Sequence, residues 1–159
     1  MDPSNKAPKV KTCLWFDGTG EEAARFYVSL LPDSSLNVVS KPDPDAPALI
    51  IEFTLASVPY QILNGGPTYT LTPATSISVL TDDQAETDRL WAALVTDGGA
   101  EGMCGWLVDR FGLSWQIVPR GLLAYLGAED REAAGRAHAA MMQMSKIDLP
   151  ALDAAFNAG

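Results

Sequence analysis

The sequence predicts an α+β fold in which two strand–helix–three-strand (βαβββ) modules form a curved mixed sheet, followed by a helical C-terminal tail. The first observation is that this order of elements occurs twice along the chain. The second is a constant offset, because 64 positions separate Thr12 from Ser76 and also separate Phe26 from Leu90. The offset falls to 55 between Gln61 and Gln116, where the first copy carries a longer proline-rich loop.

The first copy begins with a strand expected from Val10 to Asp17. Apolar and polar residues alternate there, which places Thr12, Leu14 and Phe16 on one face. A helix is expected over 21–31, with apolar residues at helical spacing and Pro32 at its end. Three further strands complete the copy, at 36–40, 48–55 and 58–64.

The second copy repeats this order. A strand is expected over 75–80, and Asp82 or Asp83 caps a helix that ends near Asp97 before two glycines. Short strands are expected near 101–109 and over 113–119. The tail then shows an apolar helical stripe. These elements predict a flexible segment 1–8, a domain 9–120 made of modules 9–66 and 75–120, and a helical extension 121–159.

Composition limits the classes of partner. The chain has 159 residues, 47% of them hydrophobic, and eleven Lys and Arg against twenty Asp and Glu give a net charge of −9. An acidic surface repels phosphate backbones, so we expect no nucleic-acid partner. No apolar run is long enough for a membrane span, and the first eight residues lack the apolar core of a signal peptide. We therefore expect no membrane partner and a cytoplasmic protein.

Two cysteines, Cys13 and Cys104, fall in predicted strands, and we expect both to be buried free thiols. Neither has metal-ligand spacing. The only histidine, His138, lies in the tail and is expected to be exposed. The sequence therefore offers no candidate base to activate either cysteine as a nucleophile.

Several stretches together resemble the PhnB-like branch of the vicinal oxygen chelate superfamily, which includes glyoxalase I, extradiol dioxygenases, and fosfomycin- and bleomycin-resistance proteins. The resemblance runs over about residues 9–156. The stretches that carry it are Leu14-Trp-Phe-Asp-Gly, the helix around Phe26-Tyr27, Leu63-Asn-Gly-Gly-Pro, Cys104-Gly-Trp-Leu-Val-Asp-Arg-Phe-Gly-Leu-Ser-Trp-Gln-Ile-Val-Pro and Met141-Met-Gln-Met-Ser-Lys-Ile-Asp. It implies the glyoxalase/bleomycin resistance fold and usually a homodimer. Members of this branch often carry the label 3-demethylubiquinone 3-methyltransferase.

Enzymes of that superfamily hold a divalent metal in a cup, and the resemblance implies four ligand positions, which the repeat register places at Thr12, Gln61, Ser76 and Gln116. Hydroxyls and neutral amides are weak ligands for transition metals, so we expect no metal and no cofactor. The expected cup instead offers a mildly polar, uncharged lining for a small neutral or cationic molecule. Its expected lining residues are Thr12, Leu14, Phe16, Gln61, Ser76, Ser78, Ser114 and Gln116.

Three function classes stay open. The first is small-molecule binding without metal, and the second is an enzyme of the same superfamily, either 3-demethylubiquinone 3-methyltransferase-like or glyoxalase/dioxygenase-like. Glu52, an acidic residue inside a predicted strand, is the reserve candidate for a catalytic acid or base. The turn at Asp17-Gly-Thr-Gly20 only superficially matches a methyl-donor site. The third class is an assembly domain whose cup is filled by its own side chains and the tail.

We also expect a homodimer. Open sheet edges need covering, and the tail carries more apolar residues than two small sheets require. Those residues are Leu122, Leu123, Met141, Met144, Leu152 and Phe156. The tail helices are expected to pack on the partner subunit or across the mouth of the cup.

Overall fold

A computed structural model describes residues 8–159, so most of the predicted N-terminal segment 1–8 lies outside the described residues. The chain divides into two compact units, Met1–Leu71 and Thr72–Gly159. The predicted α+β class, with two repeated modules and a helical tail, is confirmed. Each unit contains one four-stranded sheet, and the predicted joining of the two copies stays a prediction.

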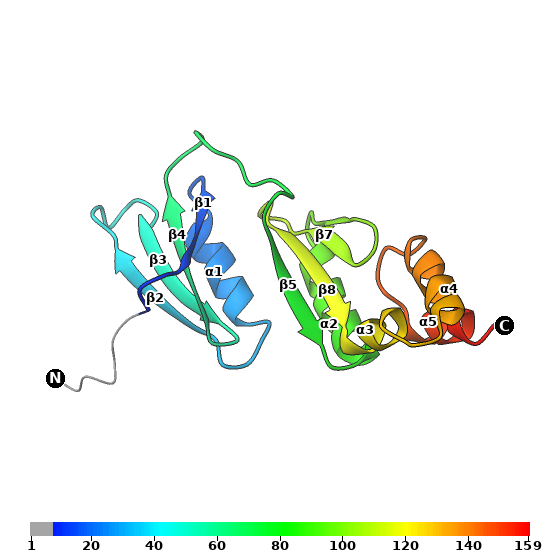
Figure 1. Ribbon diagram of the computed structural model, residues 1–159. Coiled ribbons are helices and arrows are strands. Elements are labelled where there is room, and N and C mark those ends of the chain that lie inside the picture. Colours follow the sequence, from blue (N-terminus) through cyan, green and yellow to red (C-terminus); the bar gives the residue numbers. More distant parts are fainter. Residues whose placement is uncertain (1–7) are drawn as a thin grey trace, which may run out of the picture. The chain divides into compact units, whose positions relative to one another are not determined.

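The first unit follows the predicted order of strand, helix and three strands (Figure 1). Its elements are β1 (Thr12–Phe16), α1 (Gly20–Val28), β2 (Ser35–Ser40), β3 (Ile50–Leu55) and β4 (Val58–Asn64). The strands lie in the order β1-β4-β3-β2. β1 and β4 are parallel and the other pairs are antiparallel, which makes the sheet mixed.

Helix α1 packs on one face of this sheet and buries it. Ala23, Ala24 and Tyr27 are the buried residues of the helix side, and Ile51 and Ile62 are fully buried on the sheet side. Burying one such aliphatic side chain stabilises a fold by about 1.5–3 kcal/mol, so this interface holds the unit together. Within the described part of this unit α1 is the only helix, and it therefore leaves the second face of the sheet without a helix.

The second unit repeats the topology, with strand order β5-β8-β7-β6 and a parallel β5–β8 pair. Its elements are β5 (Ser76–Thr81), α2 (Gln84–Val95), β6 (Ala100–Glu101), β7 (Trp106–Val108) and β8 (Ser114–Pro119). Asp83 is the N-cap of α2 and accepts a hydrogen bond from the Glu86 amide at 2.8 Å, as one of the two predicted caps.

The turn between β7 and β8 is organised by a buried carboxylate. Asp109 accepts hydrogen bonds from the amides of Phe111 and Leu113, at 2.8 and 3.1 Å. Its other oxygen accepts the indole N–H of Trp115 at 2.8 Å. The stretch from Asp109 to Gly112 is therefore explained by turn geometry, without reference to a ligand.

The C-terminal tail folds into α3 (Arg120–Leu126), α4 (Arg131–Met141) and α5 (Leu149–Phe156). The tail buries an apolar cluster of its own, whose buried members are Leu122, Ala137, Ile147 and Leu152. Leu122 and Leu152 are thus used within the chain, whereas the sequence predicted them as surplus for a partner. The surplus was overestimated because three short helices can bury one another's apolar faces.

The amide of Gln84 fastens this tail to α2. It donates to the carbonyl of Ile147 at 3.0 Å and accepts from the amide of Leu149 at 2.8 Å. Lys146 adds an ion pair to Asp88 at 2.5 Å, which lowers the pKa of that exposed carboxyl. The tail is therefore part of the second unit.

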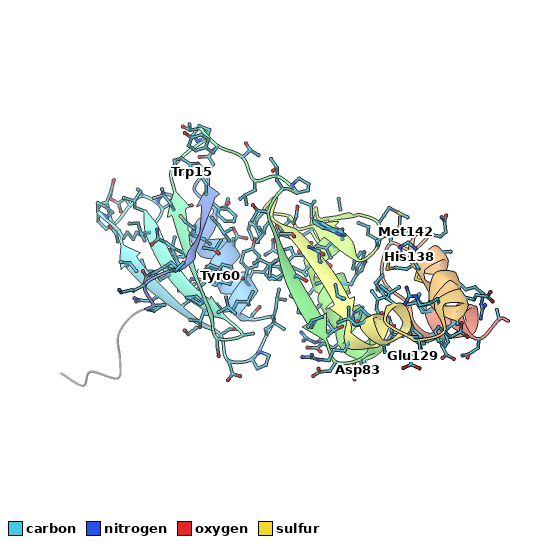
Figure 2. All side chains as sticks on the ribbon, viewed as in Figure 1. Trp15, Tyr60, Asp83, Glu129, His138 and Met142 are labelled. Carbon is cyan, nitrogen blue, oxygen red and sulfur yellow. The ribbon has the colours of Figure 1, made fainter. Side chains whose placement is uncertain are left out.

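The prediction that both cysteines are buried is wrong. Cys13 is exposed on β1, and Cys104 is half-buried in the loop between β6 and β7. Cys13 is exposed because the alternation of β1 turns it away from α1. His138 is exposed on α4, as predicted (Figure 2). No helix among residues 8–159 has the length and apolar character needed to cross a membrane.

Candidate functional site

The face of the first sheet that α1 does not cover carries a row of polar side chains, here called the polar row. Its members are Cys13, Gln61, Glu52 and Asn37, one from each strand. Gln61 lies opposite Cys13 across the β1–β4 pair and opposite Glu52 across the β3–β4 pair, and Asn37 lies opposite Glu52. Residues directly opposite in a ladder share a face, so a thiol, two amides and a carboxylate follow one another across the whole sheet.

The register corrects the predicted lining of the cup in this unit. Leu14 and Phe16 are only 2% and 3% exposed, because they lie on the buried face beneath α1. Thr12 alternates with Cys13 and so belongs to that face too. Gln61 is on the opposite face, beside Cys13, to whose sulfur its amide donates at 3.7 Å. The four predicted residues therefore do not line one surface.

Glu52 extends from the polar row to an ion pair with Lys11. Its side chain is 36% exposed, so the reserve candidate for catalysis is on an accessible face and is not buried. Lys11 was not among the predicted site residues, although it precedes Cys13 by two positions and the period of a strand puts the two on the same side. Such partly exposed pairs contribute little to stability.

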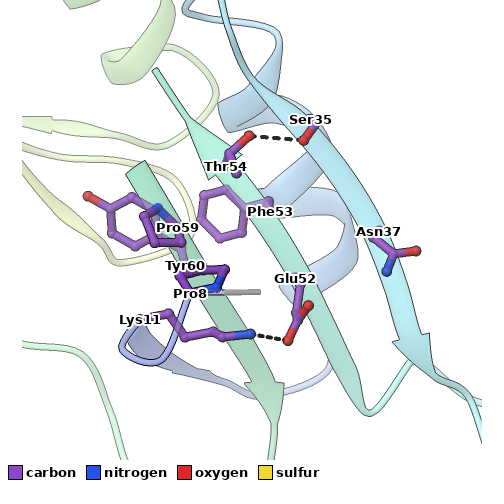
Figure 3. A pocket seen from close by; sticks show the side chains of 9 residues that line it. All are labelled: Pro8, Lys11, Ser35, Asn37, Glu52, Phe53, Thr54, Pro59 and Tyr60. Atoms are coloured by element: carbon purple, nitrogen blue, oxygen red, sulfur yellow. Dashed lines mark hydrogen bonds and ion pairs between the residues drawn. The ribbon is translucent and has the colours of Figure 1, made fainter. Parts of the chain in front are cut away.

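A cavity of about 170 Å³ opens beside this ion pair (Figure 3). At one end the ammonium of Lys11 points at the carboxylate of Glu52, and at the other the hydroxyls of Ser35 and Thr54 are 2.9 Å apart. Tyr60 also borders the cavity, but it lies opposite Thr12 and its ring stacks on Phe53 on the α1 side, where burial raises the pKa of its phenol. The full lining is Pro8, Lys11, Ser35, Asn37, Glu52, Phe53, Thr54, Pro59 and Tyr60.

At the end of the same face where β1 ends, two aromatic rings cover the sheet. The indole of Trp15, labelled in Figure 2, donates to the carbonyl of Gly66 at 2.8 Å. It meets the ring of Tyr69 edge-on, with the ring centroids 4.9 Å apart. A Cβ on Gly65 would come within 2.2 Å of this indole, so glycine is required there. The open and polar part of the face is therefore the opposite end, around the Lys11–Glu52 pair.

In the second unit the predicted residues do share one face. Ser76 pairs with Ser114 and Ser78 with Gln116 across the parallel β5–β8 ladder, on the side away from the buried Ile77 and Trp115. The Gln116 amide donates to the Ser76 hydroxyl at 2.9 Å. These four side chains are Ser76, Ser78, Ser114 and Gln116.

Ser114 is the unusual member of that set. It is 2% exposed, and its hydroxyl has no hydrogen-bond partner among the described residues. It lines a second cavity, of about 180 Å³, together with Trp106 and Val108. A buried hydroxyl without a partner costs free energy, so a ligand group that reached it would be favoured.

The donors at the four implied metal positions do not fit a transition metal. Thr12 is on the far face of the first sheet from Gln61, and Gln116 is bonded to Ser76 through its amide N–H. Hydroxyl and amide oxygens are poor ligands for zinc, nickel or iron. Within residues 8–159, no three His, Cys, Asp or Glu side chains gather closely enough to hold a metal ion.

The glycine-containing turns at 17–20 and 64–66 have structural roles. Gly18 has a φ of 81° in the turn that leads into α1. A Cβ on Gly20 would come within 2.3 Å of Ile62. Asn64 accepts from the Gly20 amide at 2.9 Å and donates to the Ala48 carbonyl at 2.7 Å, so its amide is used internally.

Comparison with known proteins places the fold. The family described as 3-demethylubiquinone-9 3-methyltransferase matches residues 8–118, so α3, α4 and α5 lie beyond the match. A PhnB protein from Bacillus cereus is 31% identical with a TM-score of 0.64, and the alignment covers 70% of this chain and 99% of that one.

Two further solved structures agree in fold. A Pseudomonas aeruginosa protein is 24% identical over 71% of this chain and 98% of that one, with a TM-score of 0.58. The fosfomycin resistance protein FosX from Mesorhizobium loti is 12% identical over 71% of this chain and 91% of that one, with a TM-score of 0.50. No curated protein matches the chain.

Proposed function

The chain belongs to the 3-demethylubiquinone-9 3-methyltransferase family, the PhnB-like branch of the vicinal oxygen chelate superfamily, and on that premise we propose that it binds a small neutral or cationic organic molecule without a metal. The observation that carries the proposal is the polar row, two of whose members, Glu52 and Asn37, line the cavity of about 170 Å³. Ligand sites combine apolar walls with a few well-placed polar groups, and this face has both.

The polar row defines which ligand groups it suits. The amides of Asn37 and Gln61 can each donate and accept, so they fit carbonyl, hydroxyl or amide groups. The carboxylate of Glu52 accepts from a hydroxyl, an N–H or a cation. A fully anionic ligand would meet Glu52 and a chain of net charge −9, which disfavours it.

A second candidate is catalysis at the same face, with Glu52 as acid or base. It is favoured by the position of Glu52 at the edge of a cavity, where a bound molecule comes within reach of its carboxylate. Lys11 would then hold the carboxylate in place as a positioning residue. Turnover of a bound compound by the wild-type protein and its loss in Glu52→Gln would favour this candidate over binding alone.

The test is a thermal-shift screen of metabolites on protein dialysed against a chelator. Compounds that raise the melting temperature of the wild type are repeated on Glu52→Gln and Gln61→Leu, and we expect the shift to disappear in both. Glu129→Gln is the matched control, because it removes an exposed carboxylate from the tail (Figure 2). Hits that survive in Glu52→Gln and Gln61→Leu would refute binding at this face.

We further propose a homodimer in the cytoplasm. Large apolar side chains stay exposed in both units, and soluble proteins cover such side chains in subunit interfaces. Examples are Val39, Val58, Leu80 and Leu123. Light scattering at micromolar concentration that gave 17.0 kDa, the mass of one chain, would contradict the dimer.

A further inference from the structure

Sulfur-containing side chains gather where the tail meets the loop before β7. Four of the five methionines and one of the two cysteines lie in these two segments, namely Met103, Cys104, Met141, Met142 and Met144. The segments are held together by two backbone hydrogen bonds of 2.7 Å, from the Cys104 amide to Met144 and from the Gly105 amide to Ser145. Methionine is otherwise almost absent from the chain, so this gathering is specific to one place.

Two of these side chains are not core fillers. Met141 and Met144 pack against the apolar cluster of the tail, which accounts for them. Met103 and Met142 are 51% and 47% exposed. Figure 2 shows Met142 close to the end of α4, one turn beyond His138. Their thioethers therefore lie at the surface, next to the half-buried thiol of Cys104.

Two of the sulfur atoms are spaced so that one metal ion could bridge them. Cys104 Sγ is 3.7 Å from Met142 Sδ, to which the thiol donates. Two of three sulfur ligands around one ion stand about 4.0 Å apart when each metal–sulfur bond is about 2.3 Å. Met103 Sδ accepts from the Ser145 hydroxyl at 3.9 Å, which keeps a third sulfur on the same pair of segments.

The backbone at Cys104 is held in an uncommon conformation. Its φ is 58°, in the left-handed region that non-glycine residues rarely adopt. Such conformations concentrate at functional sites, where the surrounding structure holds them. Here the two backbone bonds to the tail hold Cys104 and turn its thiol toward Met142.

We propose that Cys104, Met142 and Met103 bind one soft monovalent ion, Cu(I), at this junction. Thiolate and thioether are the soft ligands that Cu(I) prefers, whereas zinc and iron favour sites with more charged or imidazole donors. Binding replaces the thiol proton, which leaves to solvent as the Cys104 S–Cu bond forms, and the two thioethers stay neutral. One cation and one thiolate make an uncharged centre, which no oxidant or reductant is needed to form.

This site is separate from the proposed ligand site. It lies in the second unit, and Met142 is beyond residues 8–118, the part that the family comparison matches. The site therefore depends on the C-terminal tail of this chain. A ligand screen without hits would not contradict the Cu(I) site, and absence of Cu(I) binding would not contradict the ligand site.

The test is anaerobic competition for Cu(I) against bicinchoninate. All proteins carry Cys13→Ser, so that the exposed second thiol cannot bind the ion. We expect one equivalent of Cu(I) per chain, at least tenfold weaker binding in Met142→Leu and in Met103→Leu, and loss of binding in Cys104→Ser. Met141→Leu is the matched control and should bind as the parent does, because Met141 packs on the apolar cluster.

Two results would overturn the proposal. If Cys104→Ser bound Cu(I) as tightly as the parent, the thiol would not be a ligand. If both Met142→Leu and Met103→Leu kept the parent's affinity, neither thioether would be a ligand and only a lone thiol would remain. Thermal melting of each variant verifies folding. The two Met→Leu variants conserve volume at exposed positions, so they decide the outcome even if Cys104→Ser unfolds.

Discussion

Glu52 and Gln61 lie directly opposite each other in the antiparallel β3–β4 pair, on the sheet face that α1 leaves open. Lys11, the residue just before β1, forms an ion pair with Glu52. The sulfur of Cys13 accepts a hydrogen bond from the amide of Gln61. These four polar groups share one face of the sheet, and two of them, Lys11 and Glu52, line the cavity. This juxtaposition is the basis of the ligand proposal.

Asp109→Ala should destabilise the second unit. The substitution removes the acceptor of three donors, the part-buried amide of Phe111 and the buried amide of Leu113 and indole of Trp115. We expect the free energy of unfolding to fall by about 2–4 kcal/mol, since each lost bond to a charged group costs about 1.5–3 kcal/mol and such losses are not additive. Urea unfolding measures it, with the exposed Asp45→Ala as control. Equal stability of the two variants would be inconsistent with a structural turn.

Gly20→Ala tests whether the turn before α1 is a packing requirement. The new Cβ would be 2.3 Å from Ile62 Cγ2 and 2.6 Å from Asn64 Oδ1, so the helix start must shift. Overpacking of this kind costs about 1–3 kcal/mol. Gly135→Ala is the control, because nothing lies within 4 Å of its added Cβ, and in a helix it should stabilise by about 0.5–1 kcal/mol. Chemical unfolding that shows no loss in Gly20→Ala would contradict the packing role.

Stability should fall at alkaline pH partly through Tyr60. Burial raises the pKa of its phenol above the usual 10.0, so the folded chain favours the neutral form. The contribution is therefore complete below pH 10 and is lost as pH rises through the raised pKa. Unfolding free energies of wild type and Tyr60→Phe, measured from pH 8 to pH 11, should diverge above pH 10, with the wild type losing more. Parallel curves would show that Tyr60 does not titrate differently in the folded chain.

Purified protein should contain no stoichiometric zinc, nickel or iron. The implied ligand positions hold Thr12, Gln61, Ser76 and Gln116, and their neutral oxygens bind these ions weakly. Elemental analysis after dialysis is the measurement. About one zinc, nickel or iron per chain would show that other donors complete a site.

Much of the fold could be predicted from sequence, because period-2 alternation locates strands regardless of their neighbours. β4 was predicted with its exact limits, 58–64, and the repeated order of elements gave both sheets. Alternation also separates the two faces of one strand. Alternation does not reveal which residues of β1 share a face with which residues of β4. The two strands are parallel, and a helix and two other strands separate them in the sequence, so no tight turn fixes their register.

That missing register explains the errors in the site. Thr12 was matched with Gln61, whereas the structure pairs Gln61 with Cys13, and one residue of slip moves every side chain to the other face. In the second unit the predicted residues share one face, because Ser114 and Gln116 pair with Ser76 and Ser78. The buried cluster of the tail was missed for a related reason, since helical periodicity shows an apolar stripe without showing what covers it.

The position of a bound ligand tests the central claim most directly. Side-chain amide signals of Asn37 and Gln61 can be followed by NMR while a compound from the screen is added, and the amide of Gln84 serves as control because Ile147 and Leu149 hold it. Binding at the polar row predicts saturable shifts of the Asn37 and Gln61 signals with the Gln84 signal unchanged. Saturable shifts elsewhere in the chain, with both row amides unmoved, would contradict a ligand site on this face.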